Sequence, residues 1–184
     1  MTYKTIQNKI LVLLLFSVLF NFPYSSIIPD NSSDSNLSGE EIEILLKEHN
    51  RVRADVKQKE LIWSDEIAQY SKAWADKLAK DGCKFEHRPR SGQWKQIYGE
   101  NLFMGTKGFY GVADAVKSWE SEKKYYRSGS PIKMDSHFYK IGHYTQVVWY
   151  STEQVGCGKS FCRNNMIVVC NYNPAGNMIG DKPY

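Results

Sequence analysis

Hydrophobic residues recur at helical spacing in three segments of the chain. Residues 38–56 and 64–82 each begin with a serine, a residue type that caps helix N-termini, and the second segment ends at Gly82, which suits a helix stop. Residues 111–126 form the third segment, with charges opposite its apolar side. Apolar positions three or four residues apart predict an amphipathic helix in each segment. The inward positions are Ile42, Leu45, Leu46, His49, Val52 and Val56, then Ile67, Tyr70, Trp74 and Leu78, and then Val112, Ala115, Val116 and Trp119.

The last third of the chain carries patterns typical of strands. Residues 143–150 alternate in polarity, and residues 165–173 form a run rich in β-branched side chains, as in a buried strand. The stretch 154–161 between them is short enough to be another strand. Helices followed by strands predict an α+β fold, in which the helices pack on the faces of a small antiparallel sheet.

The N-terminal segment has the pattern of a secretory signal peptide. Two lysines precede an apolar run of eleven residues, Ile10–Phe20, whereas a membrane-spanning helix needs roughly 20. We predict a signal peptide over residues 1–26, with an uncleaved anchor as the alternative. Residues 27–39 are rich in Ser, Asn and Asp and predict a flexible lead-in, so the folded domain spans residues 40–184. The expected location is extracellular, without stable membrane insertion.

The charge of the chain argues against a nucleic-acid partner. The formal net charge is +4, and it falls to +2 without residues 1–26, because these contain two lysines and no acid. The basic residues are scattered along the chain and form no stripe.

The chain contains four cysteines, an even number in a chain expected to be exported. They predict two disulfides, and four cysteines allow three connectivities, which the spacing alone leaves open. A metal site built from these thiols is less favoured, because no C-x-x-C pair is present. The cysteines are Cys83, Cys157, Cys162 and Cys170.

The four histidines of the chain have different sequence surroundings. His49 lies on the inward side of the first predicted helix, which favours a buried structural role. His137 lies among polar residues and is expected to be solvated. His87 follows Cys83 just after the second helix, and His143 opens a predicted strand, so either could point into a cleft.

Two glutamates have surroundings that solvation does not explain. Glu100 follows a glycine between aromatic and apolar residues, and Glu122 lies three residues after the inward Trp119. Two imidazoles and two carboxylates could bind a divalent metal or act as acid and base. These candidate residues lie on four separate segments, and their spacing in the sequence leaves open whether they meet in the fold. The four residues are His87, Glu100, Glu122 and His143. The chain contains no H-E-x-x-H or G-x-S-x-G motif.

Two longer stretches resemble the signatures of a known family. "GHYTQVVWYST" and "IVVCNYNPAGN" are similar to the two signatures of the CAP superfamily, which groups cysteine-rich secretory proteins, antigen 5 and plant pathogenesis-related protein 1. The resemblance extends over residues 40–184, to a single domain of the plant type. Shorter matches are "HNRVR" at 49–53, "LIWSDEIA" with "WA" at 61–75, "YGENL" at 98–102 and "SWESEKKYY" at 118–126.

This resemblance implies a three-layer α-β-α sandwich with a central cleft. In the family the cleft is lined by two histidines and two acids, which correspond to His87, Glu100, Glu122 and His143. Members bind zinc or another divalent cation through the two histidines, and the carboxylates can orient the rings. The family supplies no agreed nucleophile or substrate, so a metal-dependent hydrolase is the least favoured function and an enzyme is not expected.

The resemblance favours a secreted protein that binds sterols or other lipids in host interaction or defence. In the family this activity is attributed to a flexible loop and apolar grooves, and the matching loop here is residues 91–111. Its aromatic side chains suggest an apolar binding surface, with core packing as the alternative. A secreted ligand for an extracellular protein is the second functional hypothesis. The loop residues are Trp94, Ile97, Tyr98, Phe103, Phe109 and Tyr110.

The plant-type members also imply a disulfide pairing. By analogy with them, Cys83 pairs with Cys162, and Cys157 pairs with Cys170. A third bridge of the plant-type proteins has no counterpart before the "GHYTQ" stretch of this chain, so that loop is expected to be looser.

Overall fold

The computed structural model describes residues 36–184. The predicted signal peptide and most of the predicted lead-in lie outside the described residues. Leu37 is buried in the core and Ser38 caps the first helix, so the fold includes the end of the lead-in. The elements are α1 (Gly39–Ala54), β1 (Ile62–Trp63), α2 (Asp65–Lys80), β2 (Gly99–Thr106), α3 (Val112–Glu120), the 3₁₀ turns η1 (Ser121–Tyr125) and η2 (Phe138–Lys140), α4 (Gly142–Val147), β3 (Gln154–Cys162) and β4 (Asn165–Asn173).

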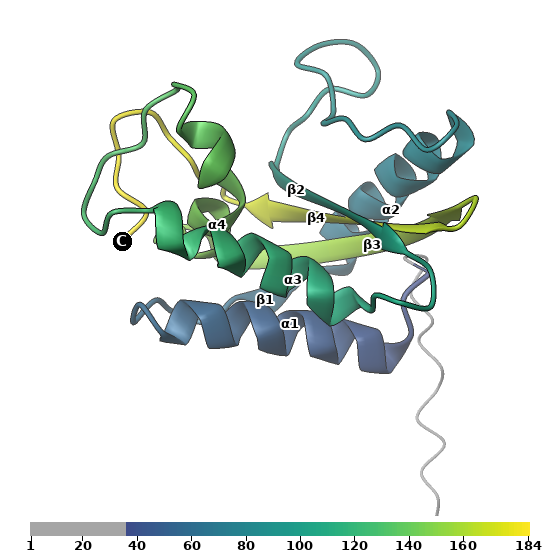
Figure 1. Cartoon of the computed structure of the whole chain (residues 1–184), viewed down its shortest axis with the longest axis horizontal. Coiled ribbons are helices and arrows are strands. Elements are labelled where there is room, and N and C mark those ends of the chain that lie inside the picture. The colour runs from purple at the N-terminus through teal and green to yellow at the C-terminus, as the bar shows by residue number, and fades with distance from the viewer. Residues whose placement is uncertain (1–35) are drawn as a thin grey trace, which may run out of the picture.

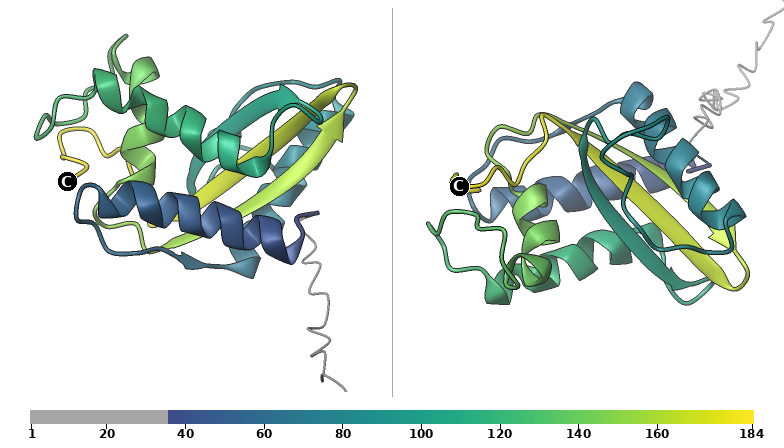
Figure 2. Two further views of the ribbon diagram at one scale, coloured as in Figure 1. Left: turned by 60° about the horizontal axis from the view of Figure 1, so that its bottom comes forward. Right: turned by 90° about the horizontal axis from the view of Figure 1, so that it is seen from above.

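The molecule has three layers around a four-stranded sheet of order β1-β3-β4-β2. Strands β3, β4 and β2 pair antiparallel, and the two-residue β1 pairs parallel with β3. Helix α2 covers one face of the sheet, and α1, α3 and α4 lie on the other side (Figures 1 and 2). The predicted α-β-α sandwich is therefore confirmed, with β1 as a parallel addition. Among the described residues, no helix has the length and apolarity that crossing a membrane requires.

Strand β4 separates the two hydrophobic cores. Successive side chains of a strand point to opposite faces. Met166, Val168 and Cys170 belong to the core under α1 and α3, whereas Ile167 and Val169 belong to the core under α2. Because both faces are covered, the strand reads as a continuous apolar run, and its prediction from the sequence is confirmed.

Two glycines of β3 allow α2 to lie close to the sheet. A Cβ atom at Gly156 would come within 2.3 Å of the backbone nitrogen of Ala68, and one at Gly158 within 2.3 Å of the Cα of Lys72. Both contacts are with helix backbone, which cannot rotate away. A larger residue at either position would therefore push α2 off β3.

The three predicted helices form, and their starts follow the expected caps. Ser38 Oγ accepts a hydrogen bond from the backbone N–H of Glu41, whose carboxylate accepts one from the Ser38 N–H, a complete capping box. Ser64 Oγ accepts from the backbone N–H of Ile67 in α2. The third helix is shorter than predicted, because it tightens into η1 after Glu120.

The prediction of a strand over residues 143–150 is wrong, because this segment begins with α4. Residues 144–149 are all buried, so no exposed side marks a helical or a strand period. The first backbone N–H groups of α4, those of His143 and Tyr144, donate to the carboxylate of Glu122 at 2.9 and 3.1 Å. A capping carboxylate some twenty positions earlier thus stabilises a helix where strand propensity favours the alternative.

Both disulfides form with the pairing implied by the plant-type resemblance. Cys157 lies directly opposite Cys170 in the β3–β4 ladder, with their Cα atoms 4.1 Å apart. Cys83 bonds Cys162 and joins the end of α2 to the end of β3. No free cysteine occurs among residues 36–184.

A buried arginine joins the first helix to the end of α4. Arg53 is fully buried, and its guanidinium donates to four backbone carbonyl groups at 2.7–3.1 Å. These four hydrogen bonds offset part of the cost of burying the charge. The acceptors are the carbonyl oxygens of Lys59, Val147, Trp149 and Thr152.

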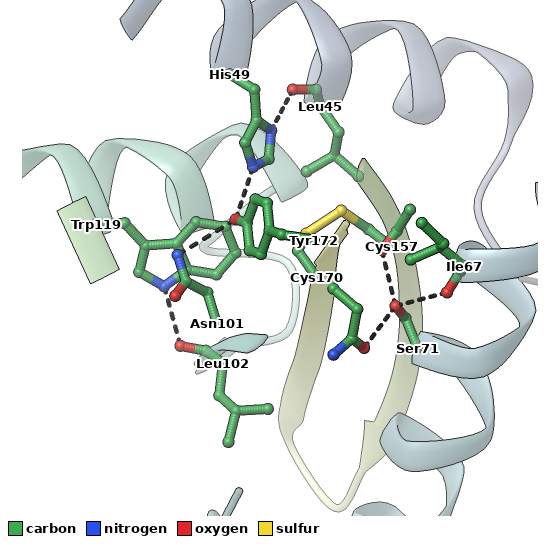
Figure 3. The surroundings of a disulfide bond; sticks show 12 residues. Leu45, His49, Ile67, Ser71, Asn101, Leu102, Trp119, Cys157, Cys170 and Tyr172 are labelled. Atoms are coloured by element: carbon green, nitrogen blue, oxygen red, sulfur yellow. Dashed lines mark hydrogen bonds between the residues drawn. A yellow bond between two sulfur atoms is a disulfide. The ribbon is translucent and has the colours of Figure 1, made fainter. Parts of the chain in front are cut away.

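His49 is a buried structural residue, as predicted (Figure 3). Its Nδ1 lies 2.7 Å from the carbonyl oxygen of Leu45, which can only accept, so Nδ1 carries the hydrogen. Its Nε2 therefore accepts from the Tyr172 hydroxyl at 2.9 Å. Burial lowers the pKa of His49 from 6.5 to about 4, because the charged ring would lose its hydration.

The depressed pKa of His49 predicts a pH-dependent stability. Between pH 6.5 and about pH 4, His49 is protonated in the unfolded chain and neutral in the folded protein. The free energy of unfolding therefore falls with decreasing pH, by about 3 kcal/mol from this residue. Urea denaturation from pH 7 to pH 4 should show a shallower acid loss for His49→Gln than for the unaltered protein. His137→Gln, at an exposed histidine, serves as the control. Equal acid slopes for His49→Gln and the unaltered protein would contradict the assignment.

Candidate functional site

The first histidine–glutamate pair joins the loop after α2 to β2. His87 Nδ1 lies 2.8 Å from Glu100 Oε1. The Glu100 side chain is 0% exposed, whereas the His87 side chain is 53% exposed. Glu100 also accepts from the backbone N–H of Arg88 at 3.0 Å and from Asn171 Nδ2 at 3.4 Å. The carboxylate is thus fixed from several sides, and the imidazole reaches the surface.

Arg88 supports this pair and was not anticipated from the sequence. Its guanidinium carbon lies 3.7 Å from the centre of the Tyr70 ring and within 5.4 Å of the Trp74 and Trp94 rings. Its buried Nε has no hydrogen-bond partner and lies 3.8 Å from Glu100 Oε2. Desolvation lowers the pKa of Arg88, and the nearby Glu100 opposes that effect. Arg88 therefore supplies a positive charge beside a fully buried carboxylate.

The second pair joins η1 to the start of α4. His143 Nδ1 lies 2.7 Å from Glu122 Oε1, while Glu122 Oε2 receives the helix-capping hydrogen bonds described above. The His143 ring lies nearly parallel to Trp119, with an interplanar angle of 13°. Its side chain is 32% exposed. One glutamate thus starts the helix and orients the histidine that the helix carries.

Asn101 connects the second pair to the buried core. Its Nδ2 donates to the backbone carbonyl of His143 at 3.0 Å and to the Tyr172 hydroxyl at 3.2 Å. Tyr172 donates in turn to His49. Figure 3 shows the core end of this connection, where Asn101 and His49 meet at the Tyr172 oxygen.

The two pairs leave their imidazoles in the same chemical state. A carboxylate oxygen can only accept, so each neutral ring carries its hydrogen on Nδ1 and a lone pair on Nε2. This carboxylate–histidine arrangement orients a ring for metal binding or proton transfer. Within residues 36–184, however, no three His, Cys, Asp or Glu residues gather as a metal site. The structure therefore forms two separate pairs and leaves zinc binding as a prediction.

A cleft of about 560 Å³ opens beside the first pair. His87, Arg88 and Glu100 line it, but Glu122 and His143 do not. Two of the four residues expected to share one cleft thus line this one, and the shared site of all four stays a prediction. Apolar side chains line the cleft as well, namely Ile97, Met134, Phe138, Met178 and Ile179.

The far wall of the cleft comes from the segment after β4, which the sequence did not predict. The backbone N–H of Gly176 donates to Gln146 Oε1 at 2.9 Å. Asn177 Nδ2 donates to the carbonyl of Gly142 at 2.8 Å, and Thr145 Oγ1 donates to Asn177 Oδ1. These bonds hold Gly176 and Asn177, which line the cleft, against α4.

The six aromatic and apolar residues of the predicted lipid-binding loop have three kinds of surroundings: the cores, the cleft and the exposed surface. Residues 99–106 form β2, and its Phe103 packs against the larger core. Trp94 packs against Trp74, with ring centres 5.7 Å apart. Ile97 and Tyr98 line the cleft. The last two aromatics, Phe109 and Tyr110, are exposed between β2 and α3. Trp94 and Phe103 thus take part in core packing. The residues left for an apolar binding surface are Ile97, Tyr98, Phe109 and Tyr110.

Comparison with known proteins finds relatives over most of the chain. Pathogenesis-related protein 1C of Nicotiana tabacum is 44% identical over 140 residues, which cover 76% of this chain and 78% of the tobacco protein. Pathogenesis-related protein PRMS of Zea mays is 36% identical over 181 residues and covers 97% of this chain and 98% of its own.

A solved structure has the same fold. The crystal structure of NaASP2 with Zn²⁺ is 30% identical in sequence and matches with a TM-score of 0.66, over 82% of this chain and 88% of that one. The family model named "CAP: Cysteine-rich secretory protein family" matches residues 46–172, which include both histidine–glutamate pairs. The chain therefore belongs to the CAP, or cysteine-rich secretory protein, family.

Proposed function

We propose that this protein acts outside the cell in defence or host interaction, and that it binds a sterol or another amphipathic lipid in the cleft beside His87. The names of the tobacco and maize relatives support the defence role. The observation that carries the binding proposal is the cleft itself. Its volume of about 560 Å³ lies in the range of small-molecule sites, roughly 300–1,000 Å³, which are mostly apolar with a few fixed polar groups.

The lining of the cleft offers apolar side chains for the apolar part of such a lipid and a polar group for its hydroxyl end. Ile97 and Ile179 are 62% and 68% exposed, and Met134 and Met178 are also exposed, so their apolar surface would be covered by a bound lipid. Methionine side chains adapt readily to ligands of irregular shape. The Nε2 lone pair of His87 can accept a hydrogen bond from a hydroxyl group. An amphipathic ligand therefore has both a polar anchor and an apolar surface here.

Placing carboxylates in the cleft should weaken sterol binding. We expect the double variant Ile97→Asp with Ile179→Asp to bind a fluorescent sterol at least tenfold more weakly, because a carboxylate resists desolvation by an apolar ligand. Ile62→Asp is the control, since Ile62 is 61% exposed, does not line the cleft and lies outside the predicted lipid-binding loop. Titration of the disulfide-intact protein by fluorescence measures both. Undiminished binding by the double variant, or equal loss in the control, would argue against the cleft.

A second candidate function is the binding of zinc or another divalent cation. The specific observation in its favour is that Glu100 and Glu122 each hold an imidazole with Nε2 available. The related NaASP2 was crystallised with Zn²⁺. His87 and His143 would supply the protein's nitrogen ligands. With two imidazoles and no third ligand in residues 36–184, we expect a weak and readily chelated site.

Zinc titration of single-histidine variants tests this candidate. If His87 and His143 share one ion, His87→Ala and His143→Ala should each remove zinc binding measured by calorimetry. Glu100→Gln should weaken it about 10–100-fold, as expected when the partner of a ligating histidine is changed. His137→Ala should bind zinc as the unaltered protein does. Zinc bound undiminished by the His87→Ala/His143→Ala double variant would refute the assignment.

A further inference from the structure

A second hollow lies in the segment between η1 and α4, and it shares no lining residue with the cleft. Its volume is about 200 Å³. Tyr126 and Ile141 provide apolar lining and are themselves buried. Arg127, Lys133 and His137 provide exposed basic lining. The hollow therefore combines an apolar base with a cationic rim.

Backbone hydrogen bonds join the segment that forms the hollow to the segment after β4. The backbone N–H of Ile132 donates to the carbonyl of Asp181 at 2.8 Å, and the N–H of Gly180 donates to the carbonyl of Ile132 at 2.9 Å. The Tyr126 hydroxyl donates to the carbonyl of Ser130 at 2.8 Å, and its ring packs against Tyr144 and Tyr184. These contacts hold the segment in place.

The cations at the rim are not neutralised by the protein. Within residues 36–184, no ion pair involves Arg127 or Lys133. The acid of the rim, Asp135, accepts the backbone N–H of His137 at 2.9 Å. Residues 123–140 contain five Lys and Arg residues and a single acid. The segment that forms the hollow therefore carries an excess of positive charge.

The volume of the hollow and its apolar base indicate which kind of anion it fits. A hollow of about 200 Å³ holds more than one tetrahedral oxyanion, and its apolar base favours a ligand with an apolar face. A pyranose ring that carries a carboxylate or sulfate meets both conditions, because its C–H face packs on aromatic rings and its charge pairs with Arg and Lys. Exposed rings also flank the hollow in sequence, at Tyr125 and Tyr139.

We propose that the hollow binds an acidic sugar unit of an extracellular polysaccharide. Arg127 and Lys133 pair with the carboxylate or sulfate, and the sugar ring contacts the small part of Tyr126 and Ile141 that lines the hollow. The neighbouring cations Lys124 and Lys140 lie along the same segment and reach the charges of adjoining units. A concave site of one-ring size favours a saccharide over a membrane surface, which is flat on this scale.

The test compares charged and uncharged polysaccharides on one sensor surface. Polygalacturonate supplies the carboxylate, heparin the sulfate, and fully methyl-esterified polygalacturonate the same sugar without charge. We expect binding to one or both acidic chains, no binding to the ester, and weakening with added salt. Arg127→Ala with Lys133→Ala should weaken binding at least tenfold. Lys59→Ala with Lys80→Ala removes two exposed cations elsewhere and should change it less than twofold.

Several outcomes would overturn the proposal. If both double variants lost binding equally, the polysaccharide would be attracted by the total charge of the protein and not by the hollow. If the protein still bound the methyl ester, the charge of the sugar would not be recognised. Binding to phosphatidylserine vesicles and to neither polysaccharide would assign the rim to a membrane surface. Because the hollow and the cleft share no lining residue, Arg127→Ala with Lys133→Ala should leave sterol titration unchanged. Failure of one proposal is thereby distinguishable from failure of the other.

Discussion

The oxygen of one buried phenol, that of Tyr172, connects the core of this protein to its candidate site. A buried hydroxyl must find partners, because water is not available to it. Tyr172 donates to His49 on α1 and accepts from Asn101 on β2. Asn101 also holds the carbonyl of His143, so the position of α4 depends on this oxygen through one intermediate. The same hydroxyl group therefore contributes both to the packing of α1 and to the position of His143.

The two glutamates of the site obey the same rule. Glu100 is fully buried and Glu122 largely so, and each is satisfied by backbone N–H groups as well as by a histidine. Glu100 lies beside the buried Arg88 and Glu122 caps the start of α4, and these positions fix the directions of His87 and His143. The chemistry available to a ligand, a lone pair on each Nε2, follows from what the fold requires of the carboxylates.

Much of this architecture follows from local sequence, and the failures have physical causes. Ser38 and Ser64 mark helix starts because caps act within one turn. Residues 143–150 are misread because a distant carboxylate starts their helix. Arg88 escapes notice because arginine is usually exposed, whereas here three aromatic rings enclose it. The four site residues are identified by family resemblance, but their division into two pairs depends on tertiary contacts that no spacing encodes.

Each glutamate holds its histidine with the hydrogen on Nδ1 and the lone pair on Nε2. Two-bond ¹H–¹⁵N correlation spectra of the histidine rings report this tautomer directly. At about pH 8 we expect the Nδ1–H form for both His87 and His143. Glu100→Gln and Glu122→Gln should each reduce that preference only at the paired ring. An Nε2–H tautomer at either histidine of the unaltered protein would mean that its glutamate does not accept a hydrogen bond from Nδ1.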